Sequence, residues 1–296
     1  MKLSWCGAVT AVLIPFVAGD QVREALAEAE LVVKVLSFNI RYGTAADGVN
    51  AWPHRRHLVF EVIRSGAYDF VGLQEALRFQ LDEIAAAVPG YAEIGVGRTD
   101  GRSQGEHSSI LFRTDRWTVD QAGTFWLSDT PSVPGSKSWG NHIPRVVTWA
   151  RFIEKRSGRA LFVFNTHFDH QSLPSRIRSA ELLTRRIQQR HPADPVIVTG
   201  DFNAVETEQT IRRLLQQRAG IRLRDTYRML HPEPGAEEAT FHAFRGVRSG
   251  RRIDYVFASE EFDVQRAAIV RTSEAGRYPS DHYPVEAILR LRATAE

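Results

Sequence analysis

The sequence predicts an α/β fold built as a single layered domain. Short runs rich in Val, Ile and Phe alternate along the chain with segments whose apolar residues recur every three or four positions. Several of the runs are apolar without interruption, as expected when both faces of a strand are covered. The chain has 296 residues and shows no internal repeat, low-complexity tract or linker, so one large domain fits it best.

Strands are expected where the apolar runs occur, because these runs have the length and the β-branched and aromatic content of strands. They occupy residues 31–40, 69–75, 108–113, 146–153, 160–168, 195–203, 251–258 and 282–291.

Amphipathic helices are expected between the strands, with Gly or Pro near their ends. They occupy residues 52–66, 78–90, 174–190 and 208–220. Five arginines crowd the third helix, and a solvated basic face explains them better than a binding surface does. They are Arg176, Arg178, Arg185, Arg186 and Arg190.

The longest irregular stretch is expected at residues 123–145, which hold two Trp, three Pro and three Gly. Long irregular loops in compact domains are often binding loops. Trp126 and Trp139 are therefore candidates to line a substrate site.

The N-terminal segment has the layout of a secretory signal peptide. Lys2 precedes an apolar stretch from Cys6 to Ala18, and small residues follow it. We expect residues 1–29 to be a signal peptide or N-terminal extension, residues 30–296 to form the domain, and the protein to be secreted or periplasmic. A buried N-terminal helix is the alternative. The apolar stretch is too short to cross a bilayer comfortably, so no stable membrane anchor is expected.

Composition sets two further limits. The chain carries 38 Lys and Arg against 35 Asp and Glu, a net charge of +3 that does not by itself imply a polyanionic partner. Cys6 is the only cysteine and lies in the N-terminal segment, so the stability of the domain must come from its core and not from disulfides.

Polar and ionisable residues stand at or beside the ends of the predicted strands. Each alone has an ordinary explanation, since an Asp after Gly is usually a turn residue and a lone His is usually a hydrogen-bonded structural group. Together they require a cation or protons, because buried carboxylates repel one another. The residues are Asn39, Arg41, Glu75, His167, Asp169, His170, Asp201, Asn203, Asp254, Asp281 and His282.

These residue types indicate a hard divalent cation and phosphoester hydrolysis. Asn, Asp and Glu offer only oxygen ligands, which Mg²⁺, Mn²⁺ and Ca²⁺ prefer. A zinc hydrolase is not favoured, because the histidines lack the His-x-x-x-His spacing of zinc helices. His167 and His282 then remain for proton transfer or charge stabilisation, and arginine can offset charge on phosphate oxygens.

The polar strand ends belong to an ordered set of motifs. The motifs are "SFNIR" (37–41), "LQE" (73–75), "GEHSSILFR" (105–113), "PRVVTW" (144–149), "NTHFDH" (165–170), "TGDFN" (199–203), "RIDYVF" (252–257) and "SDHYPV" (280–285). In this order, they resemble the endonuclease/exonuclease/phosphatase superfamily over roughly residues 32–292. The resemblance implies a four-layered α-β-β-α sandwich of two packed mixed sheets flanked by helices, and divalent-metal-dependent cleavage of phosphoesters. It is strongest to often exported bacterial and fungal members near the deadenylase branch.

The resemblance implies metal ligands and substrate-binding residues at matching positions. Mg²⁺ is the expected cofactor, with Mn²⁺ or Ca²⁺ as alternatives. The implied metal ligands are Asn39, Glu75 and Asp281, and the implied substrate-binding residues are Arg41, Glu106 and Arg145.

The resemblance also implies the residues that act on the attacking water and the phosphate. Asp201 would orient or deprotonate the water, and Asn203 would hold the water or the phosphate. His282, paired with Asp254, would act as a general base or as a phosphate-stabilising cation. His167 would stabilise the transition state.

The superfamily does not fix the substrate. A phosphodiester is expected, either a nucleic acid or a sugar or nucleotide phosphodiester that stacks on tryptophan rings. The alternatives are a phosphomonoester, a sphingomyelin-type lipid, and an inactive protein that only binds its ligand. The last is disfavoured because every signature position holds a reactive or ligating residue. We expect a monomer.

Overall fold

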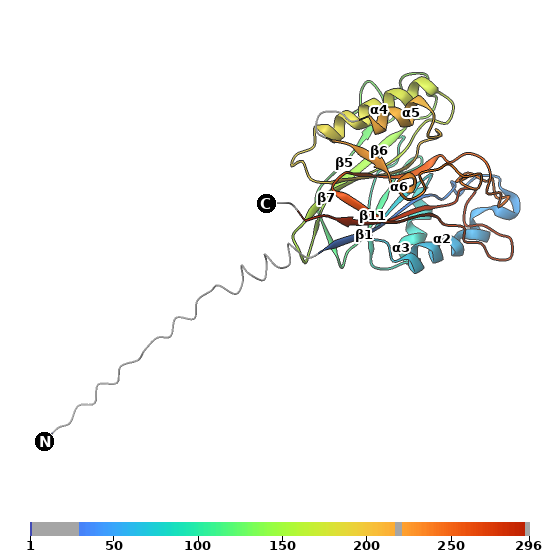
Figure 1. Ribbon diagram of the computed structural model, residues 1–296. Helices are drawn as coiled ribbons and strands as arrows, with labels where there is room; N and C mark the ends of the chain where they lie inside the picture. Colours follow the sequence, from blue (N-terminus) through green and yellow to red (C-terminus); the bar gives the residue numbers. More distant parts are fainter. Residues whose placement is uncertain (2–29, 217–220, 294–296) are drawn as a thin grey trace.

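Two six-stranded mixed sheets pack face to face, with helices on both outer faces (Figure 1). The computed structural model describes residues 1, 30–216 and 221–293. The predicted four-layered sandwich is confirmed. Apart from Met1, the predicted signal peptide lies outside the described residues, so export stays a prediction. Within these ranges, no helix is both long and apolar enough to cross a membrane.

The first sheet has the strand order β11-β12-β1-β2-β4-β3. Its central strands β1 and β2 are parallel, and the other neighbours are antiparallel. Helices α2 (Trp52–Gly66) and α3 (Arg78–Ala87) cover its outer face. The strands are β1 (Leu31–Asn39), β2 (Phe70–Gln74), β3 (Tyr91–Ile94), β4 (Ile110–Arg113), β11 (Phe262–Ile269) and β12 (Val285–Leu291).

The second sheet has the order β5-β6-β7-β8-β10-β9, again with a parallel pair, β7 and β8, at its centre. Helices α4 (Leu173–Gln188) and α5 (Gln209–Leu215) lie on its outer face. The other elements are β5 (Trp117–Trp126), β6 (Val146–Glu154), β7 (Ala160–His167), β8 (Val196–Asp201), β9 (Leu223–Asp225), β10 (Asp254–Ser259), α6 (Thr226–Leu230) and the 3-10 turn η1 (Gly48–Asn50).

Both sheets follow one plan, in which a helix connects two adjacent parallel strands. The crossover from β1 to β2 runs through α2, and the crossover from β7 to β8 runs through α4. The carboxyl ends of such strands lie at one edge of a sheet, where open α/β folds place their ligands. The fold therefore directs the ends of four strands toward a common rim.

Three apolar layers hold the two sheets and their helices together. One fills the space between the sheets, with Phe70, Phe152 and Ile197 fully buried in it. The other two lie between each sheet and its helices. Phe202 belongs to the helix-facing layer of the second sheet, where its ring packs edge-on against Phe168 at 4.9 Å. The residues that flank Phe202 are thereby left at the rim.

Several predicted boundaries are wrong. The strand β5 covers the start of the 123–145 stretch that was expected to be irregular, and the sequence did not reveal it because residues 118–122 are all exposed. The short strands β3 and β9 and the partly exposed β11 were also missed. The helix expected at 78–90 ends at Ala87, and the strands expected at 251–258 and 282–291 begin at Asp254 and Val285. Residues 217–220 of the fourth predicted helix lie outside the described ranges.

Asn165 on β7 ties the two sheets together beneath the rim. Its Nδ2 donates to the carbonyl oxygens of Leu73, at 2.8 Å, and Ser109, at 2.9 Å, both in the first sheet. Its Oδ1 accepts from Gln74 Nε2 at 2.7 Å and from Thr199 Oγ1 at 2.9 Å. This fully buried amide therefore uses both of its polar atoms to join the sheets.

Gly72 on β2 makes this close approach possible. A Cβ atom at position 72 would lie 2.1 Å from Thr199 Oγ1 and 2.6 Å from Asn165 Oδ1. Only glycine leaves room for the polar side chains that cross from the other sheet.

We expect Asn165→Ala to lower the free energy of unfolding by about 2–3 kcal/mol, because buried donors and acceptors lose their partners. Urea unfolding followed by circular dichroism measures the change. Asn50→Ala is the control, since Asn50 is only half-buried, and it should change stability by less than about 0.5 kcal/mol. Equal effects of the two substitutions would show that Asn165 does not tie the sheets.

Candidate active site

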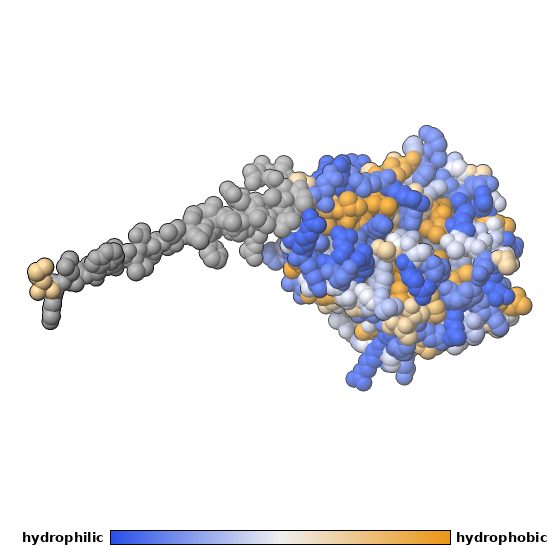
Figure 2. Space-filling view, turned by 90° about the horizontal axis from the view of Figure 1, so that it is seen from below, coloured by the Kyte–Doolittle hydropathy of each residue, from blue (hydrophilic) through white to orange (hydrophobic). Residues whose placement is uncertain are grey.

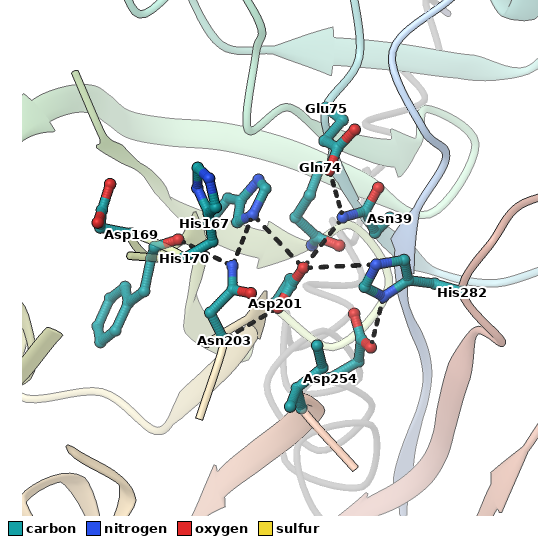
Figure 3. A network of polar contacts seen from close by, with 12 residues as sticks. Asn39, Gln74, Glu75, His167, Asp169, His170, Asp201, Asn203, Asp254 and His282 are labelled. Atoms are coloured by element: carbon teal, nitrogen blue, oxygen red, sulfur yellow. Dashed lines mark hydrogen bonds and ion pairs between the residues drawn. The ribbon is translucent and has the colours of Figure 1, made fainter. Parts of the chain in front are cut away.

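The carboxyl ends of the two parallel strand pairs meet at one rim of the sandwich (Figure 3). Asn39 ends β1, whereas His167 and Asp201 end β7 and β8. The register pairs His167 with Asp201 across β7 and β8, and Asp201 with Asp254 across β8 and β10. Strand pairing thus brings three of the predicted site residues together, and the packing of the two sheets adds Asn39 from β1.

Three predicted site residues lie in the left-handed region of backbone conformation. The φ angles are 57° at Arg41, 61° at Glu75 and 50° at Asn203. Residues with a Cβ atom rarely adopt this conformation, which costs ~1 kcal/mol or more at each position. Each of the three residues stands just beyond the end of a parallel strand. Such strain, concentrated at one rim, is typical of a functional site.

Asn39 joins the two sheets within the site. Its Nδ2 donates to Glu75 Oε1 at 3.1 Å and to Asp201 Oδ2 at 3.0 Å. Its Oδ1 accepts from the backbone N–H of Arg41 at 3.0 Å. One fully buried amide therefore holds two carboxylates that come from different sheets.

His282 lies between two carboxylates. Its Nδ1 is 2.8 Å from Asp254 Oδ2, and its Nε2 is 3.8 Å from Asp201 Oδ2. Although burial alone lowers the pKa of His282, the charges of Asp254 and Asp201 raise this pKa well above its usual range. Burial and the neighbouring Asp254 raise the pKa of Asp201 to about 7. The ring of His282 therefore carries a proton near neutral pH.

His167 is instead neutral. Burial, together with Arg145 and Arg98, lowers its pKa well below the usual value. Its Nε2 lies 3.0 Å from Asn203 Nδ2, and since an amide nitrogen only donates, Nε2 accepts this hydrogen bond. His282 and His167 thus differ in charge, because His282 bonds to Asp254 at 2.8 Å, whereas His167, although its Nε2 lies 3.4 Å from Asp201 Oδ2, is buried beside two arginines.

Arg145 lines the cleft with a nearly buried guanidinium. Its Nη2 lies 3.0 Å from His170 Nδ1, and its Nε lies 3.7 Å from Asp169 Oδ2. Its Nε and Nη1 have no hydrogen-bond partner among the described residues. A buried guanidinium with unused donors is well suited to bind an anion.

Arg98 also lines the cleft, although the sequence did not single it out. Its Nη2 donates to Glu106 Oε1 at 2.6 Å, and the backbone of Arg98 pairs with that of Glu106. The Asp100-Gly101 turn between them is a hairpin signal that could have placed Arg98 opposite the predicted Glu106. Burial lowers the pKa of Arg98 to about 10 and raises that of Glu106.

Arg41 is engaged with acidic side chains. Its Nε and Nη2 donate to the two oxygens of Asp47 at 3.1 and 3.0 Å, and its Nε lies 3.9 Å from Asp281 Oδ2. Burial raises the pKa of Asp281, an effect that His282 opposes and that Glu75 reinforces. The predicted phosphate-binding arginine thus already neutralises part of the acidic cluster.

A cleft of about 710 Å³ opens over these groups. Glu75, Asp281, Asp201, His282 and Arg145 all line it, together with Arg98. Asn39 and Asp254 lie beneath this lining and are almost completely buried. A second cavity, of about 480 Å³, lies beside α4, and no carboxylate and no predicted site residue is among the residues that line it.

The expectation that Trp126 and Trp139 line the site is wrong. The indole of Trp126 is buried and donates to the carbonyl oxygen of Arg98 at 2.7 Å, whereas the indole of Trp139 donates to Asp129 at 2.9 Å. Neither ring lines the cleft. Its aromatic lining consists of Tyr42, Phe241 and Phe244.

The carboxylates of the cleft fit a hard divalent cation. Burial raises the pKa of both Asp201 and Asp281, and a bound divalent cation would offset the cost of their buried negative charge. Ligand atoms of Asp201, Asp254 and His282 lie within 4.8 Å of one another. The direct bond between His282 and Asp254 accounts for part of that closeness, whereas Glu75 and Asp281 present their carboxylates to the cleft.

A family model described as "Endonuclease/Exonuclease/phosphatase family" matches residues 36–282. An uncharacterized protein of Acanthamoeba polyphaga mimivirus is 29% identical over 181 residues, which are 58% of this chain and 67% of that protein. Nocturnin of Drosophila melanogaster is 24% identical over 270 residues, which are 78% of this chain but only 41% of nocturnin. The chain therefore spans less than half of that relative.

Solved structures give the same family. A family member from Bacteroides thetaiotaomicron is 32% identical, with a TM-score of 0.82 and coverage of 89% of this chain and 99% of that one. The mannosyl-6-phosphatase of the same organism is 33% identical, with a TM-score of 0.79 and coverage of 87% and 99%. The human nocturnin catalytic domain with bound sulfate, at 19% identity and a TM-score of 0.69, shares the fold. This chain therefore belongs to the endonuclease/exonuclease/phosphatase family of phosphoesterases.

Proposed function

We propose that the protein is a divalent-metal-dependent phosphoesterase that hydrolyses the phosphate ester of a small ring-bearing molecule, such as a sugar phosphate. The observation that carries this proposal is one cleft lined both by the carboxylates Glu75 and Asp281 and by Arg145, whose Nε and Nη1 have no hydrogen-bond partner among the described residues. Acidic ligands for a cation and a buried anion-binding arginine are the two requirements of phosphate ester chemistry.

Glu75 and Asp281 would hold the cation. When bound, it would supply Lewis-acid stabilisation of the charge on the phosphate oxygens. Asn39 orients Glu75 through the hydrogen bond from Asn39 Nδ2. The family resemblance implies that Asn39 also ligates the cation through Oδ1, which accepts from the backbone N–H of Arg41, and this role stays a prediction.

Asp201 would accept the proton of the attacking water. Its Oδ2 is held by Asn39 at 3.0 Å, and a pKa of about 7 suits a base that works near neutral pH. His282 would remain protonated through its bond to Asp254 and offset negative charge beside Asp201. Attack of the water oxygen on phosphorus, opposite the ester oxygen, would form the new P–O bond and break the ester bond. The departing oxygen would take a proton from solvent and leave as the alcohol, with no covalent enzyme intermediate.

Arg145 and His167 would hold the phosphate, with Asn203 keeping His167 in place. Arg145 offers Nε and Nη1, which have no hydrogen-bond partner among the described residues. Asn203 donates one Nδ2 hydrogen to His167 Nε2 and the other to Phe168 O, so the N–H of His167 is at Nδ1, which also has no hydrogen-bond partner among the described residues. Donors that are fixed in this way act on the transition state because they need no rearrangement as charge develops.

A sugar phosphate fits the cleft in size and surface. Its volume of about 710 Å³ is in the range of small-molecule sites, ~300–1,000 Å³. The rings of Tyr42 and Phe241 beside the polar groups suit the apolar face of a sugar. The similar mannosyl-6-phosphatase, of which 99% is covered at 33% identity, also supports a sugar monoester.

The phosphodiester and lipid alternatives have less support. The tryptophans expected to stack on nucleic acid bases do not line the cleft, and the net charge is only +3. On the face seen in Figure 2, hydrophobic residues lie among hydrophilic ones, which does not favour a lipid bilayer as the substrate surface. Both substrate classes belong in the test.

The proposal predicts phosphatase activity that needs a divalent cation. The purified protein is assayed with Mg²⁺, Mn²⁺ or Ca²⁺ against mannose 6-phosphate, p-nitrophenyl phosphate, bis-p-nitrophenyl phosphate, single-stranded DNA, poly(A) and sphingomyelin. We expect the fastest turnover with the monoesters and none in EDTA. Turnover that survives EDTA would exclude the metal, and faster hydrolysis of the diesters would restore the phosphodiester prediction.

Asp201→Asn is expected to lower kcat by roughly 10³–10⁴-fold, because the base is lost while the shape of the side chain is kept. In EDTA, the same variant should melt about 2–4 °C higher than wild type, since the folded protein no longer confines this charge beside Asp254. Calorimetry measures the melting temperature. Asp115→Asn, at an exposed position, should change neither quantity. An active Asp201→Asn enzyme would contradict the assigned role.

Arg145→Ala is expected to lower kcat/KM for p-nitrophenyl phosphate by roughly 100-fold, the cost of losing one preorganised donor group. Arg145→Lys should recover only part of this loss, because lysine cannot reproduce the planar fork. Arg178→Ala is the control, since that side chain on α4 is 63% exposed. Unchanged kinetics in Arg145→Ala would place the phosphate elsewhere in the cleft.

A further inference from the structure

Arg55 on α2 is a completely buried cation whose hydrogen bonds go to backbone carbonyl groups. Its Nε donates to Asn50 O at 2.8 Å, and its Nη2 donates to Arg41 O at 3.1 Å. Its Nη1 donates to Ile40 O at 2.8 Å and to Pro279 O at 2.7 Å. Among the described residues it forms no direct hydrogen bond to a carboxylate. All three of its nitrogens are used to hold backbone.

Three of the four carbonyl groups bound by Arg55 belong to segments that carry predicted metal ligands. Ile40 directly follows Asn39, which bonds to Glu75. Pro279 stands two residues before Asp281, at a sequence separation of 224 residues from Arg55. A single guanidinium therefore joins the end of β1 to the segment that leads into β12.

The aromatic rings around Arg55 extend the same contact to the wall of the cleft. The guanidinium carbon lies 5.3 Å from the centre of the Trp52 ring and 5.4 Å from that of Phe244, which lines the cleft. A planar guanidinium can stack on a ring while it donates in its own plane, and an ammonium group cannot. The geometry thus requires an arginine and not merely a positive charge.

Burying this cation carries a cost. Burial lowers the pKa of Arg55 to about 10, and the charges of Asp281 and Asp47 only partly oppose the effect. A buried charge without a direct ion pair is unfavourable for stability. An apolar side chain would fill the space between α2 and β1 without the free-energy cost of burying a charge. Packing alone therefore does not explain an arginine at this position.

We propose that Arg55 is a positioning residue for the metal site, which fixes Asp281 against the Asn39–Glu75 pair so that carboxylates from both segments reach one cation. The inference rests on the proposed metal dependence. In this arrangement Arg55 touches neither the cation nor the substrate. It acts through the carbonyl groups of Ile40, Arg41 and Pro279, in the way that outer-shell partners orient metal ligands.

The variant Arg55→Lys distinguishes a positioning role from a role that needs only a positive charge. Lysine keeps the positive charge but cannot span carbonyl groups on two segments with a rigid fork. We expect the dissociation constant for Mn²⁺, measured by isothermal titration calorimetry on the full chain, to rise roughly 10-fold or more. With saturating Mn²⁺, kcat and KM for p-nitrophenyl phosphate should return to near the wild-type values. A residue needed only for folding would instead lower the melting temperature without changing Mn²⁺ affinity.

Two further variants complete the test. Arg56→Lys is the matched control, because Arg56 is the next residue on the same helix, is exposed and donates to Glu83 at 2.9 Å. Its Mn²⁺ affinity should equal that of wild type. Pro279→Ala makes the backbone around the carbonyl group bound by Arg55 more flexible, and it should raise the dissociation constant for Mn²⁺ roughly threefold. This variant tests the inference if Arg55→Lys does not fold.

The outcomes distinguish the inference from the proposed function. Wild-type protein that binds no Mn²⁺ would overturn the proposed metal dependence and the inference with it. Wild-type binding that is unchanged in Arg55→Lys and Pro279→Ala would overturn the inference alone. Weaker binding in both variants, with Arg56→Lys unaffected, would establish Arg55 as the positioning residue.

Discussion

The amide of Asn165 bonds to both sheets at once, and the spacing of the sheets beneath the active site depends on this contact. If the sheets were farther apart, Asn39 at the end of β1 could not donate to Asp201 at the end of β8, a bond of 3.0 Å between residues 162 positions apart in the sequence. Gly72 is the counterpart of Asn165, because its missing side chain leaves the space that the amide and Thr199 occupy. The positions of the rim residues therefore depend on the hydrogen bonds of Asn165, which lie in a layer between the sheets that is otherwise mostly apolar.

The two buried histidines of the rim that lie near Asp201, His282 and His167, have different charged neighbours. The carboxylates Asp201 and Asp254 share one protonated histidine, whereas Arg98 and Arg145 surround a neutral histidine, His167. Two histidines thus differ in protonation within one cleft, because burial disfavours a charged side chain unless a group of opposite charge bonds to it. Arg41 follows the same logic, since it bonds to Asp47, whereas Arg55 has no bonded carboxylate among the described residues and donates to backbone carbonyl groups instead.

Sequence patterns were sufficient for much of this architecture. Apolar runs that end in polar residues revealed the buried strands and, through the family motifs, the residues of the rim, because burial of both strand faces leaves a clear signature. The patterns failed where position depends on distant contacts. The strand β5 is exposed over half of its length, Trp126 turns its indole to the carbonyl of Arg98, and Arg55 resembles any other basic residue of an amphipathic helix. Only the folded chain shows that its donors reach Ile40 and Pro279.

The order of elements has a consequence for how the molecule matures. Asp281 and His282 immediately precede β12, the last strand that the structure describes, and β12 lies between β11 and β1, the first strand. A ribosome must therefore deliver almost the whole domain before the cleft contains its histidine–carboxylate pair. Chains that end before this segment would lack Asp281 and His282, so activity requires that the C-terminal part of the domain has paired with β1.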